Sequence, residues 1–231
     1  MSIIAIIAIG ALLALVFGPS VWVRQVMKKH GDNRQDFPGT GAELAEHLVD
    51  HYRIDGVKVE ETKPGMGDHY DPETRTVRLS ADNYHGTSLT AVAVAAHEVG
   101  HAIQHFRKER GLATRQAMVR IAMVTDRIAS IFFIAAPFLF IIARTPAAIF
   151  GMVALGIGLL AIRVLVHLVT LPVEYDASFN KALPILREGG YLQHEDDLKG
   201  ARTVLRAAAL TYVAGALMSL LDLARWIRVL R

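Results

Sequence analysis

The sequence predicts a mainly α-helical membrane protein, with about four transmembrane helices joined to a small soluble α+β unit. Hydrophobic residues make up 52% of the 231 residues and the mean hydropathy is +0.33, a more apolar composition than soluble domains usually have. Charged residues concentrate in the ranges 24–127 and 174–202, so long uncharged runs remain elsewhere. Runs of about 20 apolar residues are long enough to cross a bilayer as helices.

The first uncharged run covers residues 2–23 and has the length of a transmembrane helix. A cleaved signal peptide begins with a basic region and ends at a small-residue cleavage site. Here the first residues carry no basic side chain, and the run ends at Trp22 and Arg24, residue types that anchor helices at the membrane interface. We therefore predict a retained transmembrane anchor over residues 1–23.

A second apolar region has two arms. Residues 128–143 and 147–162 are uncharged, and Arg144 and Pro146 between them are typical of a turn. Two apolar stretches so close together predict a transmembrane hairpin over residues 128–170. A buried hairpin in a soluble core is the alternative.

Ionisable residues lie within or beside the later apolar segments. Ionisable groups inside a membrane are candidates for a function. Arg163 is close enough to the end of the hairpin for its guanidinium to snorkel to the interface, whereas the role of His167 stays open. Residues 203–231 predict a C-terminal membrane helix. Because Arg206 and Asp222 flank its apolar part closely, this helix either crosses the membrane or lies along the interface.

The distribution of basic residues predicts the orientation. Residues 24–127 hold 15 of the 25 Lys and Arg residues, and the positive-inside rule places such a segment in the cytoplasm. Arg225, Arg228 and Arg231 argue for the opposite orientation if the last helix crosses. We predict an integral membrane protein whose soluble unit faces the cytoplasm.

The soluble unit, residues 24–127, shows helix and strand signals. Thr40 followed by Glu43 three residues later is a capping box that starts a helix. Residues 171–202, beyond the hairpin, predict a further loop and helix. The remaining elements are expected as a helix over 41–53, a strand over 57–60, and a hairpin formed by 69–70 and 76–79.

The composition excludes several kinds of site. The chain has no cysteine, so a disulfide framework and a thiolate metal site are both excluded, and any metal must be held by His and carboxylate side chains. The net charge of +3 is modest, and no basic cluster is interleaved with aromatic residues as nucleic-acid binding requires. We therefore expect the lipid bilayer, and not nucleic acid, to be the partner of this protein, and the surplus positive charge is explained by the membrane.

Residues 88–105 predict a strongly apolar helix, capped by Thr87 or Ser88, that contains the pattern H-E-x-x-H. His97 and His101 lie four residues apart, so their imidazoles leave one face of the helix and can reach the same zinc ion. Glu98 lies beside them as the general base for a zinc-activated water. The alternative is two core histidines next to a surface glutamate, but burying these groups on an apolar helix without a role is costly.

A catalytic zinc ion requires a third protein ligand. His105 lies about 12 Å along the helix axis from His97, too far to share one ion with it. Glu174 follows the predicted hairpin, and two membrane crossings return the chain to the side of the histidines, so Glu174 is the expected third ligand. Asp176 is its rival.

The sequence resembles the YugP-type neutral zinc metallopeptidases and, more distantly, the HtpX-like membrane peptidases. The resemblance rests on H-E-V-G-H at 97–101, E-Y-D-A-S at 174–178 and the stretch D-H-Y-D-P at 68–72. It implies a bacterial membrane-bound endopeptidase with a zincin-like soluble unit, one Zn²⁺ per chain, and peptides or membrane proteins as substrates. Glu174 matches the third ligand of the HtpX-like enzymes, which is the Glu of an E-x-x-A-D motif. Ser178 replaces the Asp of that motif, so the resemblance implies no carboxylate at position 178 to orient a ligand histidine.

Several questions stay open at the level of sequence. Tyr70, Tyr175, Tyr212 and His69 are candidates for stabilising an oxyanion, and the strands near 57–60 and 75–79 could hold an extended substrate by strand addition. The main alternative function is a non-catalytic zinc-binding membrane assembly factor or sensor. A transporter or small pore is the second alternative.

Overall fold

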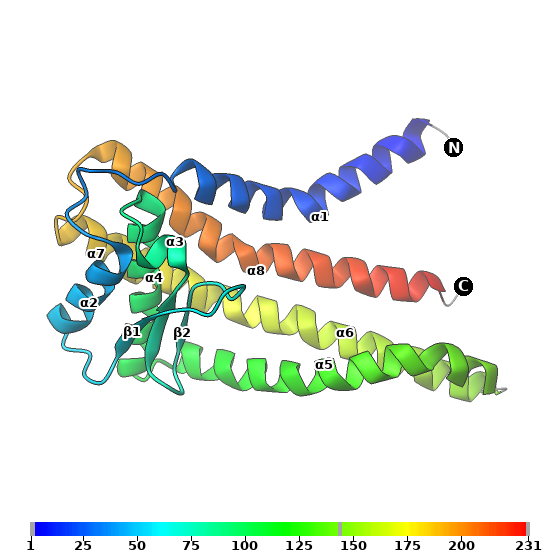
Figure 1. Cartoon of the computed structure of the whole chain (residues 1–231). Coiled ribbons are helices and arrows are strands. Elements are labelled where there is room, and N and C mark those ends of the chain that lie inside the picture. The colour runs from blue at the N-terminus through cyan, green and yellow to red at the C-terminus, as the bar shows by residue number, and fades with distance from the viewer. Residues whose placement is uncertain (1–2, 143–144, 230–231) are drawn as a thin grey trace. The chain divides into compact units, whose positions relative to one another are not determined.

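The computed structural model describes residues 3–142 and 145–229. It is mainly helical with one small sheet, as predicted (Figure 1). Arg144, in the predicted turn of the hairpin, lies outside the described residues, as do the first two and last two residues of the chain. The elements are α1 (Ile3–Lys29), α2 (Gly41–His51), β1 (Lys58–Glu61), β2 (His69–Asp71), β3 (Thr76–Leu79), α3 (Ala81–Tyr84), α4 (Leu89–Phe106), α5 (Arg110–Ile142), α6 (Pro146–Tyr175), a π-helical segment (Asp176–Ala182), α7 (Leu183–Glu188) and α8 (Glu195–Val229).

The chain forms two compact units. One, here called the helical unit, contains residues 1–19, 114–171 and 212–231. The other, here called the mixed unit, contains residues 20–113 and 172–211 and carries the sheet. Both units contain residues of α1, α5, α6 and α8. Each unit therefore combines segments that are distant in the sequence.

The mixed unit follows the predicted local signals closely. Thr40 caps α2 and forms the complete capping box with Glu43. Strands β2 and β3 pair antiparallel, which confirms the predicted hairpin, and β1 joins β3 in parallel to give the order β1-β3-β2. Because β3 is the central strand and Val77 is fully buried, strand addition by a substrate is possible only at the outer edges, not along 75–79.

The core of the mixed unit is built around α4. This helix begins after Ser88, whose hydroxyl accepts a hydrogen bond from the backbone N–H of Ala91, so Ser88 rather than Thr87 is the cap. Every residue from Leu89 to Gln104 is buried. Many of these residues are alanine, which lets neighbouring elements approach closely, and α4 packs against α2 and the π-helical segment.

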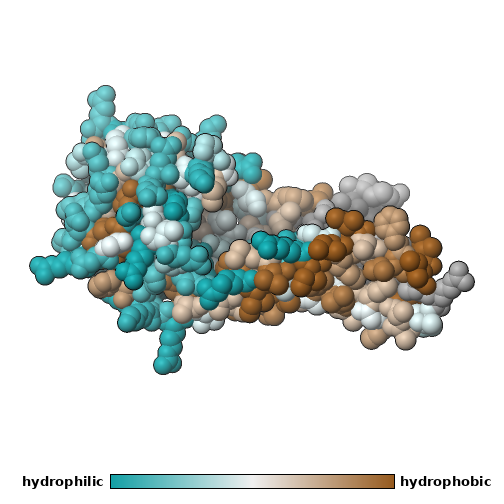
Figure 2. All heavy atoms as spheres, turned by 60° about the horizontal axis from the view of Figure 1, so that its bottom comes forward, coloured by the Kyte–Doolittle hydropathy of each residue, from teal (hydrophilic) through white to brown (hydrophobic). Residues whose placement is uncertain are grey.

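The helical unit exposes much of its apolar surface. Figure 2 shows hydrophobic residues over the long helices and hydrophilic residues over the mixed unit. Ile131, Ile134 and Phe150 each expose more than 70% of their surface, and such exposed apolar patches are typical of lipid or protein contact.

Within the described residues, two segments are long and apolar enough to cross a membrane, Pro146–Glu188 and Glu195–Leu220. Two segments of the described chain therefore meet the length and hydropathy expected of a membrane span, whereas four spans were predicted. In the other two predicted spans, the described residues 3–23 and 128–142 are helical, but α5 joins its apolar half to a charged first half that begins at Arg110.

Arg163 and His167 of the helical unit contact neighbouring helices. Arg163 donates from Nε to Asp126 on α5 at 2.6 Å, so it pairs with a carboxylate in addition to any snorkelling. His167 packs against Gly215 of α8, where an added Cβ would lie 2.5 Å from the imidazole. These contacts give both residues a role in helix packing.

Candidate metal centre

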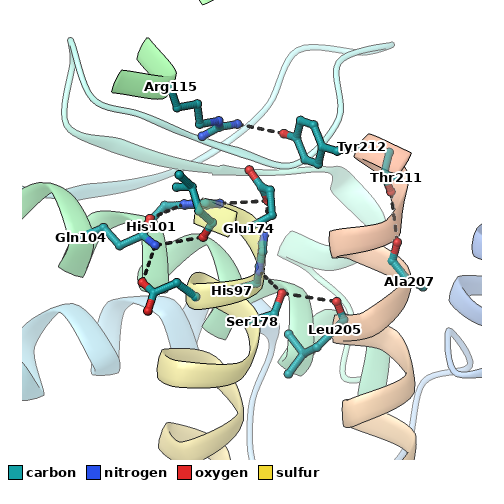
Figure 3. A network of polar contacts seen from close by, with 12 residues as sticks. His97, His101, Gln104, Arg115, Glu174, Ser178, Leu205, Ala207, Thr211 and Tyr212 are labelled. Atoms are coloured by element: carbon teal, nitrogen blue, oxygen red, sulfur yellow. Dashed lines mark hydrogen bonds and ion pairs between the residues drawn. The ribbon is translucent and has the colours of Figure 1, made fainter. Parts of the chain in front are cut away.

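Three buried side chains converge in the mixed unit (Figure 3). The Nε2 atoms of His97 and His101, both on α4, lie 3.2 and 3.3 Å from Oε2 of Glu174 near the end of α6. One ligand atom from each residue lies within 4.8 Å of the others, and none of the three residues is more than 5% exposed. Neighbouring ligands of a tetrahedral zinc ion with bonds of 2.0–2.1 Å are about 3.3 Å apart, so this spacing fits such an ion.

The hydrogen bonds of Gln104 define which nitrogen of His101 carries a proton. The side-chain N–H₂ group of Gln104 donates to the backbone carbonyl of Val173 at 3.0 Å and to Asp176 at 2.7 Å. Its oxygen therefore faces Nδ1 of His101 at 2.9 Å, and Nδ1 must donate. The lone pair of Nε2 is consequently directed at the cluster, as metal binding requires.

His97 is oriented in the same way by Ser178. The Ser178 hydroxyl donates to the backbone carbonyl of Leu205 at 3.3 Å and lies 3.0 Å from Nδ1 of His97. Since the hydroxyl proton is used, its oxygen accepts the Nδ1 proton. A fully buried serine thus does for His97 what the Asp of the HtpX-like motif was expected to do.

The cluster requires a shared cation. Glu174 lies beyond the predicted end of the hairpin at residue 170, in the mixed unit. Burial alone would raise the pKa of its carboxyl. Positive charge on His101 and hydrogen bonds with both imidazoles, which exist only when Nε2 carries a proton instead of a metal ion, lower this pKa below its usual range. A carboxylate and two imidazole nitrogens attract one another only through a proton or a metal ion that lies between them.

A π-helical turn and a glycine permit this convergence. The π-helical segment begins two residues after Glu174 and returns Ser178 to the side of His97. Gly100 on α4 faces this segment, and a Cβ at position 100 would lie 2.9 Å from the carbonyl oxygen of Ala177. Such π-helical turns are frequent at functional sites, and the glycine here allows two backbones to touch.

Asp176, the rival third ligand, and His105 are not among the converging side chains. Asp176 receives hydrogen bonds from Gln104 and Lys181; although burial opposes it, these bonds lower the pKa of its carboxyl to about 2. Asp176 is absent from the converging group and contacts it only through Gln104. His105 instead lies 2.8 Å from the hydroxyl of Tyr70.

The other sequence candidates differ in their surroundings. Glu98 follows His97 on α4 and is 6% exposed. Tyr175 is 56% exposed, His69 is hydrogen-bonded to the carbonyl of Gly67, and Tyr212 lies in the helical unit, where Arg115 donates to its hydroxyl at 2.8 Å. Gln104 was not predicted from the sequence, although its position three residues after His101 places it on the same helix face.

Replacing Gln104 by leucine is expected to lower zinc affinity by about 10- to 100-fold, since the imidazole of His101 loses the hydrogen bond that orients it. Competition with a chromophoric zinc chelator measures this affinity. Gln116→Leu is a matched control, because Nε2 of Gln116 is buried without a hydrogen-bond partner within the part of the chain described. Equal affinities of the two variants would contradict a positioning role for Gln104.

Comparison with known proteins agrees with this geometry. Residues 4–231 match the family model described as "Putative neutral zinc metallopeptidase". The chain is 35% identical over 219 residues to the "Putative membrane protease YugP" of Bacillus subtilis (strain 168), covering 95% of this chain and 93% of that protein. No solved structure matches. The chain therefore belongs to the neutral zinc metallopeptidase family.

Proposed function

We propose that this protein is an integral membrane zinc endopeptidase, with His97, His101 and Glu174 as the ligands of one zinc ion. The observation that carries the proposal is the convergence of two imidazole nitrogens, in the tautomer suited to metal binding, on one buried carboxylate oxygen. Two histidines and a glutamate are a ligand set typical of catalytic zinc, which keeps a fourth position open.

The residues around the ligands would divide the work of peptide hydrolysis. A zinc ion held there would supply Lewis acidity, which polarises a peptide carbonyl and makes water more acidic. Glu98, next to His97 on α4, would accept a proton from water and return it to the leaving amine. Gln104 and Ser178 would hold the two imidazoles in place throughout.

The membrane placement is part of the proposal. The name of the Bacillus subtilis relative and the two apolar segments support it. We propose that residues 1–23 anchor the chain, that 128–170 form a hairpin and that 203–231 form a last membrane helix. In this arrangement the soluble parts, 24–127 and 171–202, face the cytoplasm of a bacterial cell and cleave peptides or membrane proteins at the bilayer surface.

The proposal is tested by Glu98→Gln in the detergent-purified protein. We expect hydrolysis of casein or of a peptide library to fall by at least about a hundredfold, since general-base catalysis contributes 10²–10⁴, while zinc content stays unchanged. Glu46→Gln, at an exposed position on α2, is the matched control and should retain full activity.

Each other outcome has a distinct meaning. If the wild type and Glu98→Gln bind zinc equally and cleave equally, Glu98 is not the base. If both bind zinc and neither cleaves any substrate tried, the non-catalytic assembly factor or sensor gains support. If the wild type binds no zinc, the proposed centre is wrong.

A further inference from the structure

A cavity lies in the mixed unit, where the end of α1 meets the start of α8. Its volume is ≈ 430 Å³, within the range of sites that bind small molecules. None of the proposed zinc ligands lines it, so it is separate from the metal centre. The polar and aromatic side chains that line it include Trp22, Gln25, Lys29 and His30 from the α1 side, and Lys199 and Thr203 from α8.

The cavity lies where both helices change from polar to apolar sequence. The uncharged run of α1 ends at residue 23 and the apolar run of α8 begins at residue 203. Both helices therefore enter their proposed membrane segments at the cavity, and this depth rests on the membrane placement proposed above. Trp22 is the residue type that prefers the headgroup region.

The charges around the cavity leave a positive excess. Lys199 donates to Asp196, a further lining residue, at 3.0 Å, and Arg34 pairs with the neighbouring Asp197. Among the residues that the structure describes, no carboxylate pairs with Lys29. Burial, reinforced by the charge of Lys29, lowers the pKa of His30, so its ring is neutral at pH 7 and offers hydrogen bonds rather than charge.

We propose that this cavity binds the phosphate headgroup of an anionic phospholipid. Lys29 and Lys199 would contact the phosphate, Gln25 and His30 would hydrogen-bond the ester oxygens, and Trp22 would pack beside the glycerol region. A lipid phosphate fits better than a free one because the cavity lies at the end of two apolar helix runs.

The position of the cavity gives the bound lipid a link to α4. The backbone N–H and hydroxyl of Thr90, in the first turn of α4, donate to the carbonyls of His30 and Met27 at 3.0 Å each. Gly200 also lets α8 approach closely, since a Cβ there would lie 2.5 Å from Leu89 and 3.2 Å from the His30 ring. A headgroup in the cavity therefore contacts the α1 wall to which the start of the H-E-x-x-H helix is bonded.

The test uses the full-length protein with Trp226→Phe, which leaves Trp22 as its only tryptophan. The protein is reconstituted into mixtures of phosphatidylcholine and phosphatidylglycerol, and either lipid carries brominated chains that quench nearby tryptophan. Trp22 is expected to favour the anionic lipid by roughly fivefold for each lysine that contacts it. Adding Lys29→Gln and Lys199→Gln should bring the preference close to one.

Lys28→Gln is the matched control, since Lys28 neighbours Lys29 but does not line the cavity, and it should keep most of the preference. An equal loss in Lys28→Gln and Lys29→Gln would overturn the site in favour of diffuse surface charge. No preference in the parent protein would overturn it as well. A Lys29-dependent change in Trp22 fluorescence on adding inorganic phosphate to pure phosphatidylcholine bilayers would show a soluble ligand instead.

Two parallel measurements separate this proposal from the proposed function. Zinc content reports on the metal centre. A wild type that contains no zinc but still prefers the anionic lipid would contradict the proposed peptidase and leave the lipid site standing. Release of the wild type from membranes by alkaline carbonate would overturn both proposals. Retention in the membrane with full zinc content but no lipid preference overturns the lipid site alone.

Discussion

Replacing Glu174 by glutamine is expected to abolish peptide hydrolysis and to weaken zinc binding by more than about a hundredfold. Loss of an outer hydrogen bond to a ligand already costs 10- to 100-fold, and here a ligand itself changes from a carboxylate to a neutral amide. Glu174 is 1% exposed, so water cannot easily take its place. Zinc content after gel filtration and a competition titration measure the effect.

Asp176→Asn provides the comparison that decides between the two candidate ligands. The asparagine oxygen can still accept the hydrogen bond from Gln104, so we expect a loss of zinc affinity far smaller than in Glu174→Gln. Because zinc stabilises the folded state in proportion to its binding, thermal unfolding with and without a chelator gives a second readout. A greater loss in Asp176→Asn would make Asp176 the ligand.

Gly100→Ala is expected to have the second-largest effect. The added Cβ would lie 2.9 Å from the Ala177 carbonyl oxygen. Since that oxygen belongs to the backbone and cannot rotate away, α4 and the π-helical segment must separate. Overpacking of this kind costs about 1–3 kcal/mol of stability. The separation also pulls His97 and His101 away from Glu174, and small misplacements at an active site lower activity by up to about a hundredfold.

The control for this substitution is Gly158→Ala in α6, where nothing lies within 4 Å of the added Cβ. In a helix interior with free space, alanine is more favourable than glycine by about 1 kcal/mol. The two variants should therefore change the apo-protein melting temperature in opposite directions. Equal shifts in the melting temperature and unchanged zinc affinity in Gly100→Ala would show that the close approach is unimportant.

Features that depend on neighbouring residues could be predicted from the sequence. The capping box of Thr40 and Glu43, the β2–β3 hairpin and the helix that carries H-E-x-x-H are local patterns, and the structure confirms them. The approach of Glu174 to the histidines was predicted from a count of two membrane crossings, which needs no detail of packing, and the structure brings the three side chains together.

Features that depend on packing between distant segments could not be predicted. The parallel pairing of β1 with β3 joins residues on either side of an intervening strand, and no local pattern encodes it. Ser178 was expected to provide no carboxylate that could orient a ligand histidine. Its hydroxyl faces His97 instead because of the π-helical segment, which no local pattern predicts. Gln104 was recoverable in principle, by asking which side chain could hold Nδ1 of His101.

The proposed zinc ligands lie 77 residues apart in the chain, His97 before the predicted hairpin and Glu174 after it. A ribosome adds about 5–20 residues per second, so several seconds pass between the synthesis of the first ligand and that of the last. Within that interval the nascent chain holds two histidines and a base but no complete centre. In the proposed topology, the metal centre is completed only after the hairpin is inserted, so the nascent chain carries no complete centre while it is still close to the translation machinery.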